Sequence, residues 1–100
     1  MIRHVVMWRF EEMAEGKTRQ QNMEYIRDRL MALPAIIPQI KRMEIGFDIG
    51  HTEMSYDMLL LTEFESMADL DIYKNHPDHV AVSKYVAKVR TSRVVADCEI

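Results

Sequence analysis

The sequence has little of what several classes of protein require. Its only cysteine, Cys98, excludes an internal disulfide and fits a reducing cytoplasm, where we expect the protein to be. The three glycines are not spaced as a phosphate-binding loop. Acidic residues outnumber basic ones by 16 to 13, so the net charge of -3 provides no basic surface for nucleic acid. No apolar run approaches the roughly 20 residues that cross a bilayer, and we expect no membrane association.

What is present is typical of a globular protein. Hydrophobic residues make up 48% of the 100 residues and charged residues 29%, which is not the composition of a disordered chain. This length predicts one domain over residues 1–100. Because a chain this short buries only a modest core, we expect a partner molecule to contribute to its stability.

Four segments have the composition of β-strands, over residues 2–10, 40–49, 56–64 and 91–99. Side chains alternate in 2–10, and both alternating sets are apolar at the centre. Segment 56–64 is also apolar on both sides, which predicts a strand whose two faces are both covered. Segment 40–49 has one polar face for much of its length, which is typical of an edge strand. Residues 11–17 are polar and are expected to form a loop.

Helical patterns occupy two regions between these strands. The first begins after Thr18, a favourable N-cap, carries an apolar stripe at helical spacing, and ends before Pro34. The second begins after Ser66, another favourable N-cap. Pro77 forces the preceding His76 out of helical geometry and is itself favoured as the first residue of a new helix. The second helical region is therefore predicted to consist of two pieces joined at this histidine.

The resulting order, β-α-β-β-α-β, predicts a ferredoxin-like α+β fold: a four-stranded antiparallel sheet with helices on one face. The first and third strands are then central, in agreement with their two apolar faces. The helices can cover only one face of the sheet. A second copy of the chain is the simplest cover for the other face, so we expect a homodimer.

Periodicity brings three polar residues toward one place. His4 shares its strand face with Val6, the more apolar side, so we expect it to face the helices. Tyr73 shares a helix face with Leu70, and His79 lies on the apolar face of the restarted helix. His4, Tyr73 and His79 can therefore converge in one cavity between sheet and helices.

The restarted helix also affects the protonation of His79. As the third residue of a helix that begins at Pro77, its ring lies near backbone N–H groups and the positive end of the helix dipole, which disfavour a second proton. Burial acts in the same direction, whereas Asp78 opposes it. We therefore expect a neutral imidazole able to accept a proton. His76 and His79 do not predict a metal site, because their spacing is short and no second cluster of ligands exists.

The sequence resembles the stress-responsive A/B barrel (Dabb) family over essentially its whole length. The residues that carry the resemblance lie in 2–10, in Ile37-Pro38 followed by Gly46, in 62–64, in Tyr73 followed by His76-Pro77-Asp78-His79, and in 94–97. The resemblance implies a dimeric α+β barrel, which agrees with the architecture inferred above. It implies no cofactor.

The family includes a plant polyketide cyclase that works by aldol condensation without a cofactor. By resemblance, its catalytic group corresponds to His4, Tyr73 and His79. His79 would be the base, Tyr73 its hydrogen-bonding partner, and His4 would stabilise a developing enolate. This chain departs from that enzyme on the third strand, where Met58 stands in place of a further pocket histidine.

Several functions remain open at this point. The first is binding of an apolar, aromatic or polyketide-like small molecule, with Val6, Trp8, Met58 and Leu70 expected to contact it. The second is an enzyme, a cyclase, lyase or isomerase, or a cofactor-free monooxygenase as in other dimeric α+β barrels. The third is a structural stress protein without a ligand, in which the histidines and the tyrosine only close the helix junction. An open cavity would favour the first two, and a filled core the third.

Overall fold

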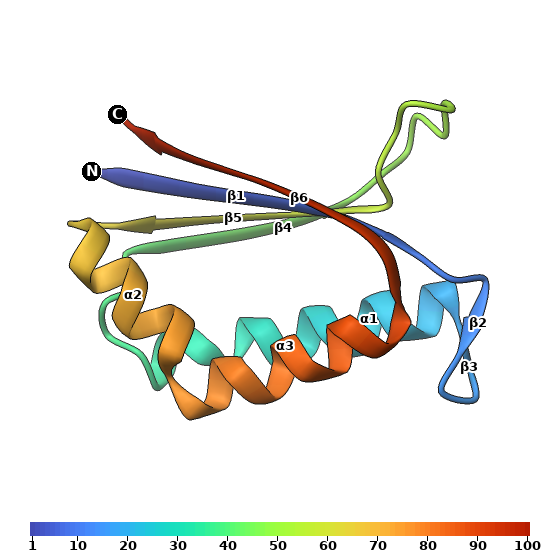
Figure 1. Cartoon of the computed structure of the whole chain (residues 1–100), viewed down its shortest axis with the longest axis horizontal. Helices are drawn as coiled ribbons and strands as arrows, with labels where there is room; N and C mark the ends of the chain where they lie inside the picture. Colours follow the sequence, from blue (N-terminus) through green and yellow to red (C-terminus); the bar gives the residue numbers. More distant parts are fainter.

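The computed structural model describes residues 1–100 and contains one layer of helices below one sheet (Figure 1). The elements follow in the order β1 (Ile2–Phe10), β2 (Met13–Ala14), β3 (Lys17–Thr18), α1 (Arg19–Met31), the short 3-10 helix η1 (Leu33–Ala35), β4 (Arg42–Phe47), β5 (Met58–Phe64), α2 (Met67–Asn75), α3 (Pro77–Val89) and β6 (Arg90–Glu99). The predicted ferredoxin-like α+β fold is confirmed.

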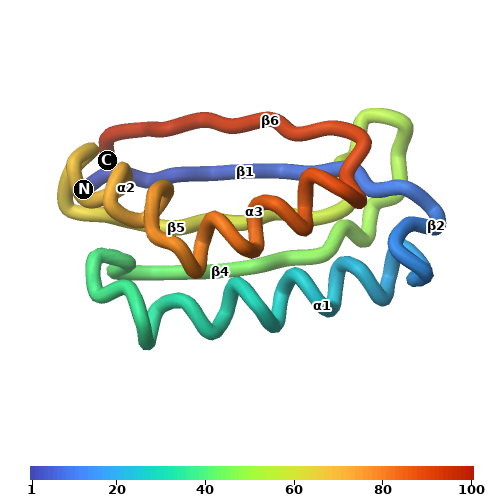
Figure 2. The backbone as a smooth tube through the Cα atoms, turned by 60° about the horizontal axis from the view of Figure 1, so that its bottom comes forward, coloured from blue at the N-terminus to red at the C-terminus, as the bar shows by residue number.

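The four long strands form an antiparallel sheet in the order β4-β5-β1-β6, which Figure 2 shows side by side. β1 and β5 are central and β4 is an edge strand, as their patterns predicted. β6 forms the other edge. Its pairing with β1 brings Asp97 opposite His4 and Arg93 opposite Trp8. Directly opposite residues project to the same face, so these two β6 side chains lie on the helix side of the sheet.

Local capping explains where the helices begin. Thr18 accepts a hydrogen bond from the backbone N–H of Gln21, whose side chain accepts one from the N–H of Thr18, completing a capping box. Ser66 accepts from the N–H of Asp69 at the start of α2. His76 separates α2 from α3 as predicted, with extended φ and ψ of -64° and 134°. The second helical region is therefore two helices joined at one histidine.

Residues 11–17, expected to form only a loop, contain part of a small hairpin. Met13 pairs with Thr18 and Ala14 with Lys17. The turn residues Glu15 and Gly16 both have positive φ, 53° and 73°. Two successive residues of positive φ match the twist of a tight hairpin, which is why a glycine is needed here. The prediction missed these strands because two-residue strands have no measurable alternation.

The hydrophobic core lies between the sheet and the helices. β1 and β5 alternate strictly, with every second side chain buried. The opposite face of the sheet is not covered, and Val5, Met7 and Leu59 remain partly exposed there. The β4–β5 connection, residues 48–57, projects on this uncovered side (Figure 1) and carries Ile49 and Met54, which are 92% and 83% exposed. No helix combines the length and apolar character needed to cross a membrane.

Candidate functional site

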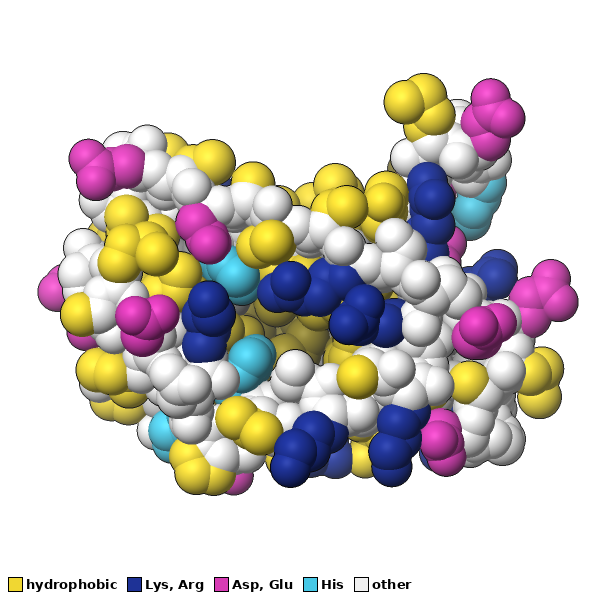
Figure 3. Space-filling model, viewed as in Figure 1, with side chains coloured by type: hydrophobic (Ala, Val, Ile, Leu, Met, Phe, Trp, Pro, Cys, Tyr) yellow, Lys and Arg dark blue, Asp and Glu magenta, His cyan; other side chains and the backbone are white.

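A cavity of about 400 Å³ lies between the sheet and α3. Its floor is formed by side chains of β1, among them His4, Val6 and Trp8, and its opposite wall by residues of α2 and α3, among them Tyr73 and His79. Figure 3 shows the hollow from outside, with yellow apolar side chains inside it and two cyan histidines at its border. The size is within the usual range for small-molecule sites.

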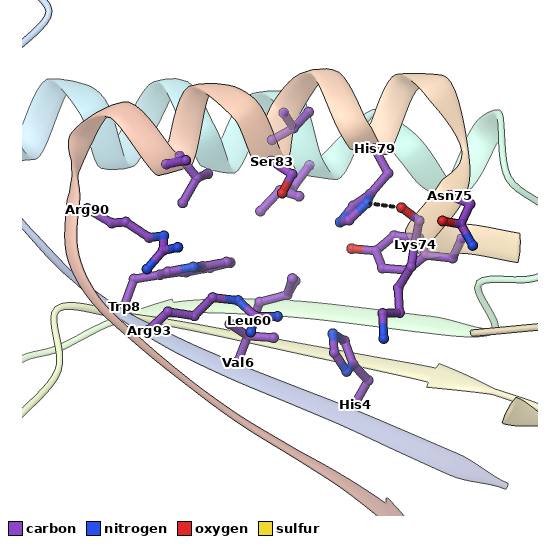
Figure 4. Close-up of a pocket in the computed structure, with 15 residues that line it drawn as sticks. His4, Val6, Trp8, Leu60, Lys74, Asn75, His79, Ser83, Arg90 and Arg93 are labelled. Atoms are coloured by element: carbon purple, nitrogen blue, oxygen red, sulfur yellow. Dashed lines mark hydrogen bonds between the residues drawn. The ribbon is translucent and has the colours of Figure 1, made fainter. Parts of the chain in front are cut away.

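His4 is held by a carboxylate on the neighbouring strand. Its side chain is 4% exposed, and its Nδ1 donates to Oδ1 of Asp97 at 2.5 Å. A carboxylate partner fixes the ring orientation and the tautomer, leaving the lone pair on Nε2. Figure 4 shows the His4 ring rising from β1 beside Lys74. His4 is therefore arranged to accept a proton, or to donate one once protonated, on the cavity side.

Tyr73 lies between the two histidines. Its ring centroid is 4.2 Å from that of His79 and 6.4 Å from that of His4. The side chain has no exposed surface, and its hydroxyl is the one buried side-chain polar atom without a hydrogen-bond partner. Buried hydroxyls are nearly always paired, because loss of hydration is otherwise uncompensated. The Tyr73 hydroxyl is therefore an exception to this rule.

The helix junction positions His79. His76 caps α3 by accepting from the N–H of Asp78, 3.1 Å from its Nδ1. In a continuous helix that N–H would bond to the carbonyl of Lys74, four residues earlier. The carbonyl of Lys74 is instead 3.1 Å from Nδ1 of His79, which donates to it (Figure 4). This bond places the lone pair of the neutral ring on Nε2 in His79 as well.

Burial governs the protonation of all three groups. It lowers the pKa of His4, against the opposing hydrogen bond and charge of Asp97. Burial also lowers the pKa of His79, against the bond to the Lys74 carbonyl, and the positive charge of Arg93 adds to the lowering. Burial raises the pKa of the Tyr73 hydroxyl well above its ordinary value. At neutral pH the site thus combines two neutral imidazoles with a protonated phenol.

Five of the seven residues expected at the site line this cavity: His4, Val6, Trp8, Tyr73 and His79. Met58 and Leu70, expected as ligand contacts, do not line it. Both are buried in the core, at 1% and 0% exposure. The periodicity of their elements correctly predicted that both side chains point into the core. Whether an inward side chain reaches the cavity depends on its position along the element. Met58 begins β5 opposite Phe47 and lines a different depression, near the 48–57 connection.

The sequence interpretation missed the charged residues around the cavity. It did not assign Asp97 to His4, and it named none of the cations Lys74, Arg90 and Arg93, which line the cavity. One signal was present: Arg93 and Asp97 are four apart in a strand and therefore share a face. The face pattern alone cannot give the register that puts Asp97 opposite His4 rather than two residues away.

The comparison with protein families gives a match that covers nearly the whole chain. The stress responsive A/B barrel domain family (Dabb) matches residues 2–100. The chain therefore belongs to this family, which confirms the resemblance seen in the sequence over essentially its whole length. None of the curated protein sequences gives a significant match.

Solved structures with the same fold include bacterial and plant proteins. A dimeric ferredoxin-like protein of unknown function from Bacteroides fragilis is 27% identical, with a TM-score of 0.85 over 99% of this chain and 95% of its own. A dimeric ferredoxin-like protein of unknown function from Thermobifida fusca is also 27% identical, with a TM-score of 0.84 over 99% and 90%. The hydroxynitrile lyase of Passiflora edulis is 21% identical, with a TM-score of 0.83 over 99% and 92%, and shows the fold alone.

Proposed function

We propose that this protein binds an apolar or aromatic small molecule in the cavity between the sheet and α3. The observation that carries the proposal is the unpartnered hydroxyl of Tyr73 in the wall of this cavity. An unsatisfied buried hydroxyl costs about 1–3 kcal/mol. A polar atom of a ligand that reaches this hydroxyl would remove that cost.

The open volume argues against a purely structural role. The cavity of about 400 Å³ bordered by His4, Tyr73 and His79 opens to the surface and is large enough for a ring, whereas a purely structural role would favour a filled core there (Figure 3). Trp8 in its floor offers an aromatic surface on which a ring can stack.

A thermal-shift screen with aromatic acids and polyketide-like compounds tests binding, because a ligand that binds only the folded state raises Tm. Ser83 and Ala81 are both exposed on α3, but only Ser83 lines the cavity. Ser83→Phe should fill the cavity and abolish the shift, and Ala81→Phe should preserve it. Equal shifts in both variants would place the ligand elsewhere and refute the proposal.

The pair of His4 with Asp97 favours a second candidate, an enzyme of the cyclase, lyase or isomerase type. A carboxylate that orients a histidine also stabilises the protonated ring. His79 would take a proton from a carbon acid, Tyr73 would donate a hydrogen bond, and His4, protonated on Nε2 and held by Asp97, would stabilise the enolate. His79→Ala should abolish turnover of a compound found in the screen while only weakening its binding. Unchanged turnover would exclude this role for His79.

We also propose a homodimer formed through the uncovered face of the sheet. Support comes from the partly exposed Val5, Met7 and Leu59 on that face, from the apolar tip of the 48–57 connection beside it, and from the two dimeric bacterial neighbours. Light scattering after gel filtration at micromolar concentration should give twice the chain mass. Leu59→Asp should shift the protein toward monomer, and a wild-type monomer would refute the proposal.

A further inference from the structure

The charged residues around the cavity all have the same sign. Lys74, Arg90 and Arg93 line it, and no aspartate or glutamate does. In Figure 3 a band of dark-blue Lys and Arg side chains borders the hollow. The chain as a whole carries a net charge of -3, so this concentration of positive charge is local.

None of these three cations has a protein partner. Their side chains make no ion pair and no hydrogen bond within the molecule, whereas Arg3, Arg19 and other surface arginines are paired with carboxylates. The nearby carboxylate of Asp97 is bonded to His4. Guanidinium groups bind planar oxyanions through paired hydrogen bonds, so unpaired arginines beside a cavity are available for such a group.

The cations are not evenly distributed. Figure 4 shows Arg90 and Arg93 at the Trp8 end of the cavity and Lys74 at the His4 end. The floor between them is apolar, with Val6 and Leu60. A ligand with one anionic end and an apolar or aromatic body can therefore place its anion at the pair of arginines and its body over Val6 and Leu60.

We infer that the ligand is an organic acid whose carboxylate is held by Arg90 and Arg93, with its apolar or aromatic body lying along the cavity floor. The inference presupposes the ligand cavity proposed above and specifies the chemical class of its occupant. A carboxylate matches the flat guanidinium groups, and the apolar floor requires a hydrocarbon body. Simple inorganic anions would lack that body and should bind poorly.

Matched pairs of acids and their neutral amides test the charge requirement separately from binding itself. The probes are phenylacetate, 3-phenylpropanoate and octanoate, each with its primary amide. None absorbs where Trp8, the single tryptophan and part of the cavity floor, is excited, so its fluorescence reports binding. At least one acid should bind about tenfold or more tightly than its amide, the ratio expected from one charge-assisted hydrogen bond.

Amides that bind as well as the acids would overturn the inference and leave the proposed function standing. Failure of every probe would count against both.

Substitutions locate the carboxylate. Arg93→Gln and Arg90→Gln should each reduce acid affinity by about tenfold and leave amide affinity unchanged. Lys84→Gln is the matched control, because Lys84 is exposed on α3 and does not line the cavity. A larger loss in Lys74→Gln than in either arginine variant would overturn the placement at the Trp8 end. If an arginine variant fails to fold, the salt dependence of wild-type binding decides: acid affinity should fall as salt screens the cations, and amide affinity should not.

Discussion

Tyr73→Phe should make the free protein more stable. The substitution keeps the ring, with its contacts to Phe64 at 5.1 Å and His79 at 4.2 Å between centroids, and removes only the buried, unpartnered hydroxyl. Relief of its lost hydration is worth about 1–3 kcal/mol. The hydroxyl-sized void, about 12 Å³ at roughly 24 cal/mol per Å³, costs about 0.3 kcal/mol. The net gain in unfolding free energy is therefore about 0.7–2.7 kcal/mol.

Urea unfolding at fixed protein concentration measures this gain, as a higher midpoint with an unchanged slope. Tyr85→Phe is the control. Its hydroxyl donates to Oδ1 of the buried Asn22 at 2.5 Å, so its removal should destabilise the protein by about 1 kcal/mol. If Tyr73→Phe is also destabilising, its hydroxyl has a partner in solution, such as a bound water, and the reasoning from an unsatisfied group is refuted.

Two further predictions concern the histidines. Asp97→Asn should lower the pKa of His4 further, because it removes the carboxylate that opposes burial; NMR titration of the ring checks this, and an unchanged or raised pKa would contradict it. Because burial holds the pKa of His4 and His79 below their unfolded values, the unfolded state binds more protons below pH ~6.5. The free energy of unfolding should thus fall as pH drops from about 7 through that range. The fall should be less steep in the double variant His4→Gln/His79→Gln. If urea titrations give the same pH dependence of unfolding free energy for the wild type and the double variant, other groups cause the effect.

The elements of this fold could be predicted because their signals are local. Alternation fixes which side chains of β1 and β5 are buried, and Thr18, Ser66 and His76 each cap a helix through a neighbour within three residues. The central position of the first and third strands followed from the β-α-β-β-α-β order of the elements, and their two apolar faces agreed with it. These signals need no knowledge of long-range pairing.

The remainder of the site depends on pairing that a single sequence does not encode locally. Asp97 lies 93 residues from His4, and their contact exists because β6 pairs with β1 in one particular register. A shift by two residues would keep every face and lose the contact. Met58 illustrates the same limit, since its inward direction was predictable and its distance along the strand from the cavity was not.

The break between α2 and α3 has a consequence for anyone who redesigns this protein. Replacing a proline that kinks a helix usually restores a backbone hydrogen bond and stabilises the helix. Here the broken turn releases the Lys74 carbonyl, and His79 holds on to that same oxygen. Pro77→Ala, chosen to regularise the backbone, would let the N–H of Asp78 reclaim the carbonyl and would leave the imidazole without its anchor. The carbonyl oxygen that the break leaves without a backbone partner is the same atom that holds the His79 ring. A substitution that repairs the helix would therefore release that ring.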